Sequence, residues 1–146
     1  MRADGRPTDS PAAVVERLRR ATNAHDLDAV AACFAVDYRN ETPVHPARGF
    51  RGRDQVRRNW ERIFAAVPDV AAHVRQLAVD GDTVWTEWEH TGTRPDGSPH
   101  LMRGVVIFGV RDGAVASARF YLEPVDQGPD GVDNAVRHQV APGGAA

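Results

Sequence analysis

Apolar and polar residues alternate along the stretch from Val84 to Pro124, a pattern that predicts β-strands. The stretch consists of three apolar runs and the two turns between them, in the order 84–92, 95–98, 100–110, 112–113 and 114–124. The second turn is an Asp-Gly pair, which is the strongest short-range hairpin signal when it stands between apolar runs. We therefore expect an antiparallel meander. Residues 70–79 predict a further strand that joins it through an Asp-Gly-Asp turn.

Upstream of the meander, apolar residues recur every three or four positions, which is the spacing of amphipathic helices. Ser10-Pro11 predicts the start of a helix over residues 11–23, because serine caps a helix and proline fits its first turn. Asp26 caps a second helix, whose apolar positions are Leu27, Val30, Ala31 and Phe34. A third helix begins at Asp54 and stops at Pro68, and its apolar stripe consists of Val56, Trp60, Ile63, Phe64 and Val67.

The remaining segments are short or polar. Residues 37–42 predict an extended run, and residues 43–49 contain two prolines and a glycine and predict a loop long enough to fold over a pocket. Residues 1–10 are expected to be disordered, and residues 126–146 to form a mobile tail with one helical turn near Ala135. The organised part, residues 11–125, has the length of one domain.

Residue parity divides the meander into two faces, since side chains alternate across a strand. One face is apolar with an isolated histidine: Thr86, Trp88, His90, Met102, Gly104, Val106, Phe108, Ala118, Phe120 and Leu122. The other mixes apolar groups with charges: Trp85, Glu87, Glu89, Arg103, Val105, Ile107, Arg119, Tyr121 and Glu123. We expect the first face to line a cavity and the second to form a homodimer contact. An ordinary solvent face is the alternative, but it would leave several large apolar side chains in water.

Composition narrows the possible partners and chemistry. The net charge of −2 gives no drive toward nucleic acid, and the acidic residues among the arginines of the third helix favour a solvated face over a phosphate site. All 18 basic residues are arginine, which excludes lysine Schiff bases and phosphate-loop chemistry. No apolar run is long enough for a membrane span. The single cysteine, Cys33, is expected to be buried and fits a reducing compartment, so we expect a cytoplasmic protein.

The expected cavity face and the helices below it form a mostly apolar pocket, as small-molecule sites do. Its expected members are Tyr38, Asn40, Trp60, Phe64, Thr86, Trp88, His90, Met102, Gly104, Val106, Phe120 and Leu122. Gly104 would leave room for a ligand; alternatively, it marks a bulge that curves the sheet. No metal site is expected, because the six histidines lack ligand spacing, and no nucleotide motif points to a cofactor.

His90 is the only group on this face that titrates near pH 7, so it is the candidate general base or acid, with Tyr38 and Asn40 orienting a water or a substrate oxygen. The alternative is a structural histidine hydrogen-bonded to Tyr38 or to a loop carbonyl. His45, in the loop over the pocket, is a second candidate.

Three landmarks give the chain a resemblance to the nuclear transport factor 2-like superfamily, and within it to the SnoaL-like polyketide cyclases and limonene epoxide hydrolases. They are residues 23–28, the pair Tyr38-Arg-Asn40 and Gly52-Arg-Asp54, and Val110-Arg-Asp-Gly113 followed by residues 119–123. The resemblance implies an α+β cone in which a curved antiparallel sheet wraps around three N-terminal helices. In the epoxide hydrolases, a tyrosine and an asparagine that match Tyr38 and Asn40 hold the attacking water.

The chain departs from these relatives at the other catalytic positions. His90, Trp88 and Phe120 stand where the hydrolases have an Asp-Arg-Asp constellation, and the cyclase aspartate also falls at or beside Phe120. We therefore expect a domain that binds an apolar, polyketide- or terpenoid-like molecule. It either acts on that molecule without a cofactor, by cyclisation, isomerisation, dehydration or water addition, or carries it without chemistry. A cyclase that works by shape alone is a third possibility.

Overall fold

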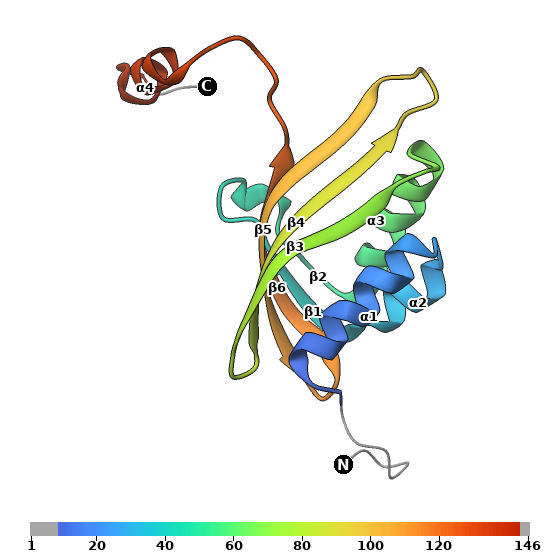
Figure 1. Cartoon of the computed structure of the whole chain (residues 1–146). Coiled ribbons are helices and arrows are strands. Elements are labelled where there is room, and N and C mark those ends of the chain that lie inside the picture. Colours follow the sequence, from blue (N-terminus) through green and yellow to red (C-terminus); the bar gives the residue numbers. More distant parts are fainter. Residues whose placement is uncertain (1–8, 144–146) are drawn as a thin grey trace.

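A curved sheet covered on one side by helices forms the body of the protein (Figure 1). The computed structural model describes residues 9–143, so most of the N-terminal segment expected to be disordered, and the last three residues, lie outside it. The elements are α1 (Pro11–Asn23), α2 (Leu27–Ala32), β1 (Phe34–Glu41), η1 (Pro46–Arg48), β2 (Phe50–Arg51), α3 (Arg53–Ala66), β3 (Ala71–Asp80), β4 (Thr83–Thr93), β5 (Pro99–Arg111), β6 (Ala114–Pro124) and α4 (Val132–Val140). The expected α+β class is confirmed.

The six strands lie in the order β2-β1-β6-β5-β4-β3. The expected meander is present as β4, β5 and β6, with Trp88 opposite Gly104 and Gly104 opposite Leu122. Asp112 and Gly113 both have positive φ, 54° and 74°, as a two-residue hairpin turn requires. The sequence did not predict β2, nor that β1 pairs with β6 in parallel, the one parallel pair of the described sheet.

Two predicted helix boundaries differ from the structure. Phe34 was expected in the second helix, but α2 ends at Ala32 and Phe34 opens β1, where it pairs with Val115 and the Cys33 carbonyl accepts from the Val115 amide at 2.8 Å. The long-range pairing prevails over the helical spacing. In the tail, the single turn expected near Ala135 is the nine-residue helix α4, which stands apart from the sheet in Figure 1.

The core lies between α1, α2 and the inner face of the sheet, where Trp88, Val106, Phe108 and Ala118 are buried. On the opposite face, Trp85 is 49% exposed. The parity of the strands thus separates the two faces as expected. None of the described helices combines the length and the apolar character that crossing a bilayer requires.

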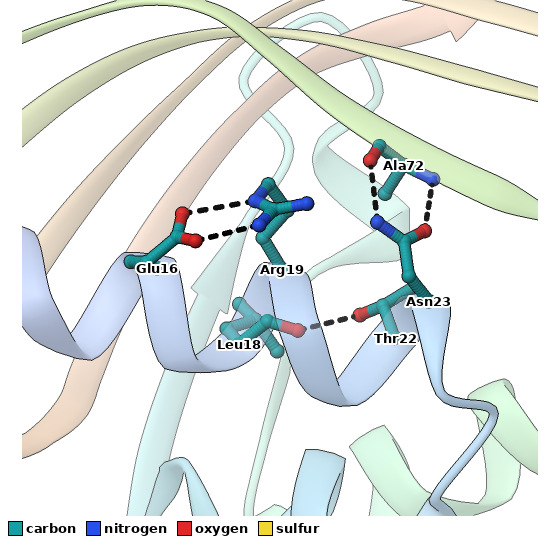
Figure 2. Close-up of polar contacts among 6 residues, drawn as sticks. All are labelled: Glu16, Leu18, Arg19, Thr22, Asn23 and Ala72. Atoms are coloured by element: carbon teal, nitrogen blue, oxygen red, sulfur yellow. Dashed lines mark hydrogen bonds and ion pairs between the residues drawn. The ribbon is translucent and has the colours of Figure 1, made fainter.

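The C-terminal end of α1 is tied to β3 by Asn23 (Figure 2). Its amide donates to the Ala72 carbonyl at 2.9 Å and accepts from the Ala72 amide at 2.7 Å. At the preceding residue, the Thr22 hydroxyl donates to the Leu18 carbonyl at 2.9 Å, so its hydrogen is used inside the helix. Next to the Asn23–Ala72 hydrogen bonds, His25 contacts the Val70 carbonyl at 2.7 Å. These contacts hold the C-terminal end of α1 and the turn after it against the start of β3.

Removing the two hydrogen bonds between the Asn23 side chain and the Ala72 backbone should lower the stability of the domain. Asn23→Ala leaves the amide and the carbonyl of Ala72 without their partner, and we expect the free energy of unfolding to fall by about 2 kcal/mol. Asn23→Asp is the matched control: it can still accept from the Ala72 amide but places a carboxylate against the carbonyl. Urea unfolding that gave equal stability for wild type and Asn23→Ala would contradict a stabilising role for the Asn23–Ala72 hydrogen bonds.

Candidate functional site

A cavity of about 350 Å³ opens between α3, β1 and the ends of β4, β5 and β6. It is lined by Phe34, Tyr38, Asn40, Thr42, Arg48, Phe50, Val56, Asn59, Trp60, Ile63, His90, Met102, Phe120, Leu122 and Glu123. A recess of about 40 Å³ lies deeper, lined by Leu18, Thr22, Phe34, Trp60, Trp88, His90, Val106, Phe108, Phe120 and Leu122. Five residues line both spaces: Phe34, Trp60, His90, Phe120 and Leu122.

Helix α3 forms one wall because its cavity residues follow helical spacing. Val56, Asn59, Trp60 and Ile63 are three, four and seven positions apart and so share one side of the helix. The sequence singled out Trp60 from this stripe. It missed Asn59, whose side-chain carbonyl accepts from Gln55 at 2.8 Å. Phe64, also expected in the pocket, lines neither space and instead stacks on His25 with ring centroids 4.9 Å apart.

Tyr38 and Asn40 lie side by side on β1, as their alternating positions predict, and both line the cavity. The Tyr38 hydroxyl donates to the Asn40 side-chain carbonyl at 2.8 Å, and the Asn40 amide donates to Thr42 at 3.4 Å. Burial raises the pKa of Tyr38 far above its usual value, so its phenol stays protonated. The pair is therefore a neutral hydrogen-bonding group.

His90 lies between two tryptophans, with its ring centroid 5.8 Å from those of Trp60 and Trp88. Burial among these groups, with a smaller effect of His100, lowers the pKa of His90 to about 4, so the imidazole is neutral at pH 7. Among residues 9–143, no hydrogen bond joins the imidazole to Tyr38 or to a loop carbonyl. The alternative interpretation of His90 as a structural histidine expected one of these two hydrogen bonds, and neither is found among the described residues.

Thr86 and Gly104 were both expected on the cavity face, but they line neither the cavity nor the recess. The Thr86 hydroxyl accepts from the Trp88 indole and donates to the Val106 carbonyl, both at 2.6 Å, so it fixes the Trp88 ring inside the sheet. Gly104 lines neither space. A Cβ at this position would lie 2.0 Å from the Tyr121 carbonyl oxygen, so the room that the glycine provides is filled by the backbone of β6. Gly104 thus allows β5 to approach the backbone of β6 closely. The strands keep a regular register at this position, so neither the expected space for a ligand nor the alternative bulge is found there.

The mouth of the cavity carries His45, which the sequence placed in the loop over the pocket, together with Arg48 and Glu123, which it did not place there. His45 and Arg48 come from the loop before β2, and Glu123 from the end of β6. The Glu123 carboxylate contacts His45 Nε2 at 2.8 Å and the Arg48 guanidinium at 3.9 Å. Parity assigned Glu123 to the outer face, but it is the last residue before Pro124, where the strand ends and the loop reaches its side chain.

A larger hollow of about 570 Å³ lies on the outer face of the sheet, but it is open and charged. Its carboxylates are occupied: Glu89 accepts from Arg103 at 2.7 Å, which lowers the Glu89 pKa, and Glu87 accepts from Gln76 at 2.8 Å. Within residues 9–143, no three histidine, cysteine, aspartate or glutamate side chains are grouped as metal ligands. The cone cavity is therefore the candidate site.

Comparison with known proteins agrees with this architecture. The wild-type structure of IdmH from Streptomyces antibioticus, a candidate polyketide cyclase, is 25% identical and superposes with a TM-score of 0.69 over 79% of this chain and 93% of that one. An epoxide hydrolase of the limonene type from Mycobacterium tuberculosis is 21% identical, with a TM-score of 0.67 over 77% and 82% of the two chains.

A third similar structure is a Mycobacterium tuberculosis protein in complex with estradiol-17beta-hemisuccinate, 20% identical with a TM-score of 0.67 over 77% of this chain and 94% of that one. No curated protein matches the chain by sequence. The family model of the SnoaL-like domain matches residues 15–118. The cone, its cavity and this match together show that the chain belongs to the SnoaL-like domain family.

Proposed function

We propose that the chain binds an apolar small molecule, polyketide- or terpenoid-like, in the cone cavity and transfers protons on it without a cofactor. The observation that carries the proposal is the position of His90, a neutral imidazole that lines both the outer cavity and the inner recess. Trp60, Trp88, Met102, Val106, Phe120 and Leu122 provide the apolar walls.

In this proposal, His90 accepts or returns a proton, and the Tyr38–Asn40 pair binds a substrate oxygen or a water. Because its pKa is about 4, the imidazole is in its basic form at pH 7 and needs no prior deprotonation. The Asn40 amide and the Tyr38 oxygen offer one donor and one acceptor within the cavity wall. Cyclisation, isomerisation, dehydration and water addition can all use a base together with a hydrogen-bond donor and acceptor of this kind. A reducing compartment such as the cytoplasm suits the one thiol, Cys33, which is buried.

The proposal is tested in two stages. A thermal-shift screen of polyketides and terpenoids, with native mass spectrometry, identifies a stabilising compound, and its conversion by wild type is then compared with that by His90→Ala. We expect turnover to fall at least about 100-fold, since a positioned acid or base contributes that much. The control His73→Ala removes an exposed histidine of β3 that lines neither space and should leave turnover unchanged. Equal turnover in His90→Ala would remove His90 from the mechanism.

A ligand carrier without chemistry is the second candidate function. Two observations favour it: the imidazole is a weak base at a pKa of about 4, and Glu123, at the mouth, is the one carboxylate among the described residues that line the two spaces. A compound that stabilises the protein and is recovered unchanged would support this candidate.

We also propose that the outer sheet face forms a homodimer contact. Leu77, Val79, Trp85 and Val105 are 41%, 49%, 49% and 36% exposed on β3, β4 and β5. Beside them, the Arg103–Glu89 pair crosses between neighbouring strands at 2.7 Å. Large apolar groups next to arginine are typical of the buried centre of an interface.

Trp85→Glu should convert the dimer into a monomer, because it places a carboxylate at the centre of this apolar patch. Sedimentation velocity of both proteins at the same concentration measures the change. Val36→Glu is the matched control, since Val36 is 71% exposed on β1, outside the patch. Wild type that sediments as a monomer would contradict the proposed dimer.

A further inference from the structure

The cavity is graded from an apolar interior to a polar mouth. The recess has only apolar walls apart from His90 and Thr22, and the Thr22 hydroxyl is already bonded to the Leu18 carbonyl. The outer cavity adds the side chains of Thr42, Asn59, Arg48 and Glu123. A ligand that fits both parts has an apolar body and one polar end, and the polar end lies at the mouth.

The two charged side chains at the mouth, Glu123 and Arg48, differ in how much of their hydrogen-bonding capacity is used. One carboxylate oxygen of Glu123 is bonded to His45 at 2.8 Å, whereas the other lies 3.9 Å from the nearest Arg48 nitrogen, beyond hydrogen-bond distance. Arg48 donates no side-chain hydrogen bond to any of residues 9–143, and its side chain is 63% exposed. It is also the one guanidinium among the described residues that line the cavity.

We propose that the ligand of this cavity carries a carboxylate at its polar end and that Arg48 binds it. The inference rests on the proposed binding of an apolar molecule in the cone and adds the chemical class and the orientation of that molecule. A guanidinium with unused donors matches a carboxylate in geometry and charge. Glu123 stays paired with His45, and the apolar body of the ligand then extends inward past Trp60 to His90.

Three probes with one chain length and different ends test the inference: decanoate, decanol and decylammonium. Titration calorimetry at pH 7, with tryptophan fluorescence as a second readout because Trp60 lines the cavity, gives their dissociation constants. We expect wild type to bind decanoate about tenfold more tightly than decanol, and decylammonium most weakly.

Two variants should shift the decanoate affinity in opposite directions. Arg48→Gln should weaken decanoate binding about tenfold, to the level of decanol, and Glu123→Gln, which keeps an acceptor for His45 but loses the negative charge, should strengthen it several-fold. Decanol should bind all three proteins alike. Arg51→Gln, an exposed residue of β2 outside the cavity lining, is the control and should bind decanoate as wild type does.

The outcomes separate this inference from the proposed function. If decanol or decylammonium binds as tightly as decanoate, or if Arg48→Gln binds decanoate as wild type does, the inference is overturned while the cone remains a small-molecule site. If none of the three probes binds, the inference and the proposed apolar ligand site are both overturned.

Discussion

Gly104→Ala is expected to lower the free energy of unfolding by about 4 kcal/mol, near the upper end of single-residue effects. The backbone at Gly104 has a φ of 154°, and an added Cβ would lie 2.0 Å from the Tyr121 carbonyl oxygen and 2.9 Å from the Leu122 Cα. Both obstacles are backbone atoms of β6, so relief requires the two strands to move apart. That movement would open the ladder between β5 and β6 beside the cavity.

Gly109→Ala is the matched control for this effect. It adds the same methyl group to the same strand, but its nearest neighbour is the Ser117 hydroxyl at 2.5 Å, a side-chain group that can rotate away. We expect a cost of about 1 kcal/mol at this position. Urea unfolding measures both variants. Equal stability of Gly104→Ala and wild type would mean that β5 and β6 do not approach each other as closely as described.

Acidification from pH 6.5 to pH 4 should destabilise the wild-type protein through His90. Its pKa falls from 6.5 in the unfolded chain to about 4 in the folded one, so between these values the unfolded state binds the extra proton. Stability from this group is therefore complete above pH 6.5 and is lost as the pH falls toward 4. One pKa unit corresponds to about 1.4 kcal/mol, so the loss amounts to about 3 kcal/mol.

His90→Gln isolates this contribution, because glutamine is polar and does not titrate. Denaturant unfolding of both proteins at a series of pH values should show the difference in stability shrinking by about 3 kcal/mol on acidification. Carboxylates with lowered pKa values, such as Glu16 beside Arg19, act in both proteins and cancel. A difference that stays constant from pH 7 to pH 4 would show that His90 is not buried as a neutral group.

The fold was predictable from the sequence because its main elements carry local signals. The Ser10-Pro11 start of α1 and the Asp112-Gly113 turn appear in the structure as predicted. The parallel pairing of β1 with β6 carries no such signal. This pairing joins segments that are far apart in the chain. Only residues 37–42 of β1 were predicted as extended, because Phe34 also fits the helical spacing of α2.

The interior of the site was predictable, and its mouth only in part. Parity placed Trp88, His90, Phe120 and Leu122 on the cavity side, and the structure brings them around the recess. Parity placed Glu123 on the outer face, but its side chain lies at the end of β6, where it reaches His45 of the loop before β2. His45 was expected in the loop over the pocket. The positions of Arg48 and Glu123 beside it depend on tertiary contacts that the sequence pattern does not encode.

The ¹⁵N NMR spectrum of the His90 imidazole, recorded at pH 7 with and without decanol, tests the central claim most directly. The ring nitrogens report protonation, and decanol in the cavity would lie against this ring. We expect the pattern of a neutral imidazole, and a shift of the His90 signals on addition of decanol that His100 does not share. A protonated His90, or signals that decanol leaves unchanged, would contradict a ligand cavity organised around a neutral His90.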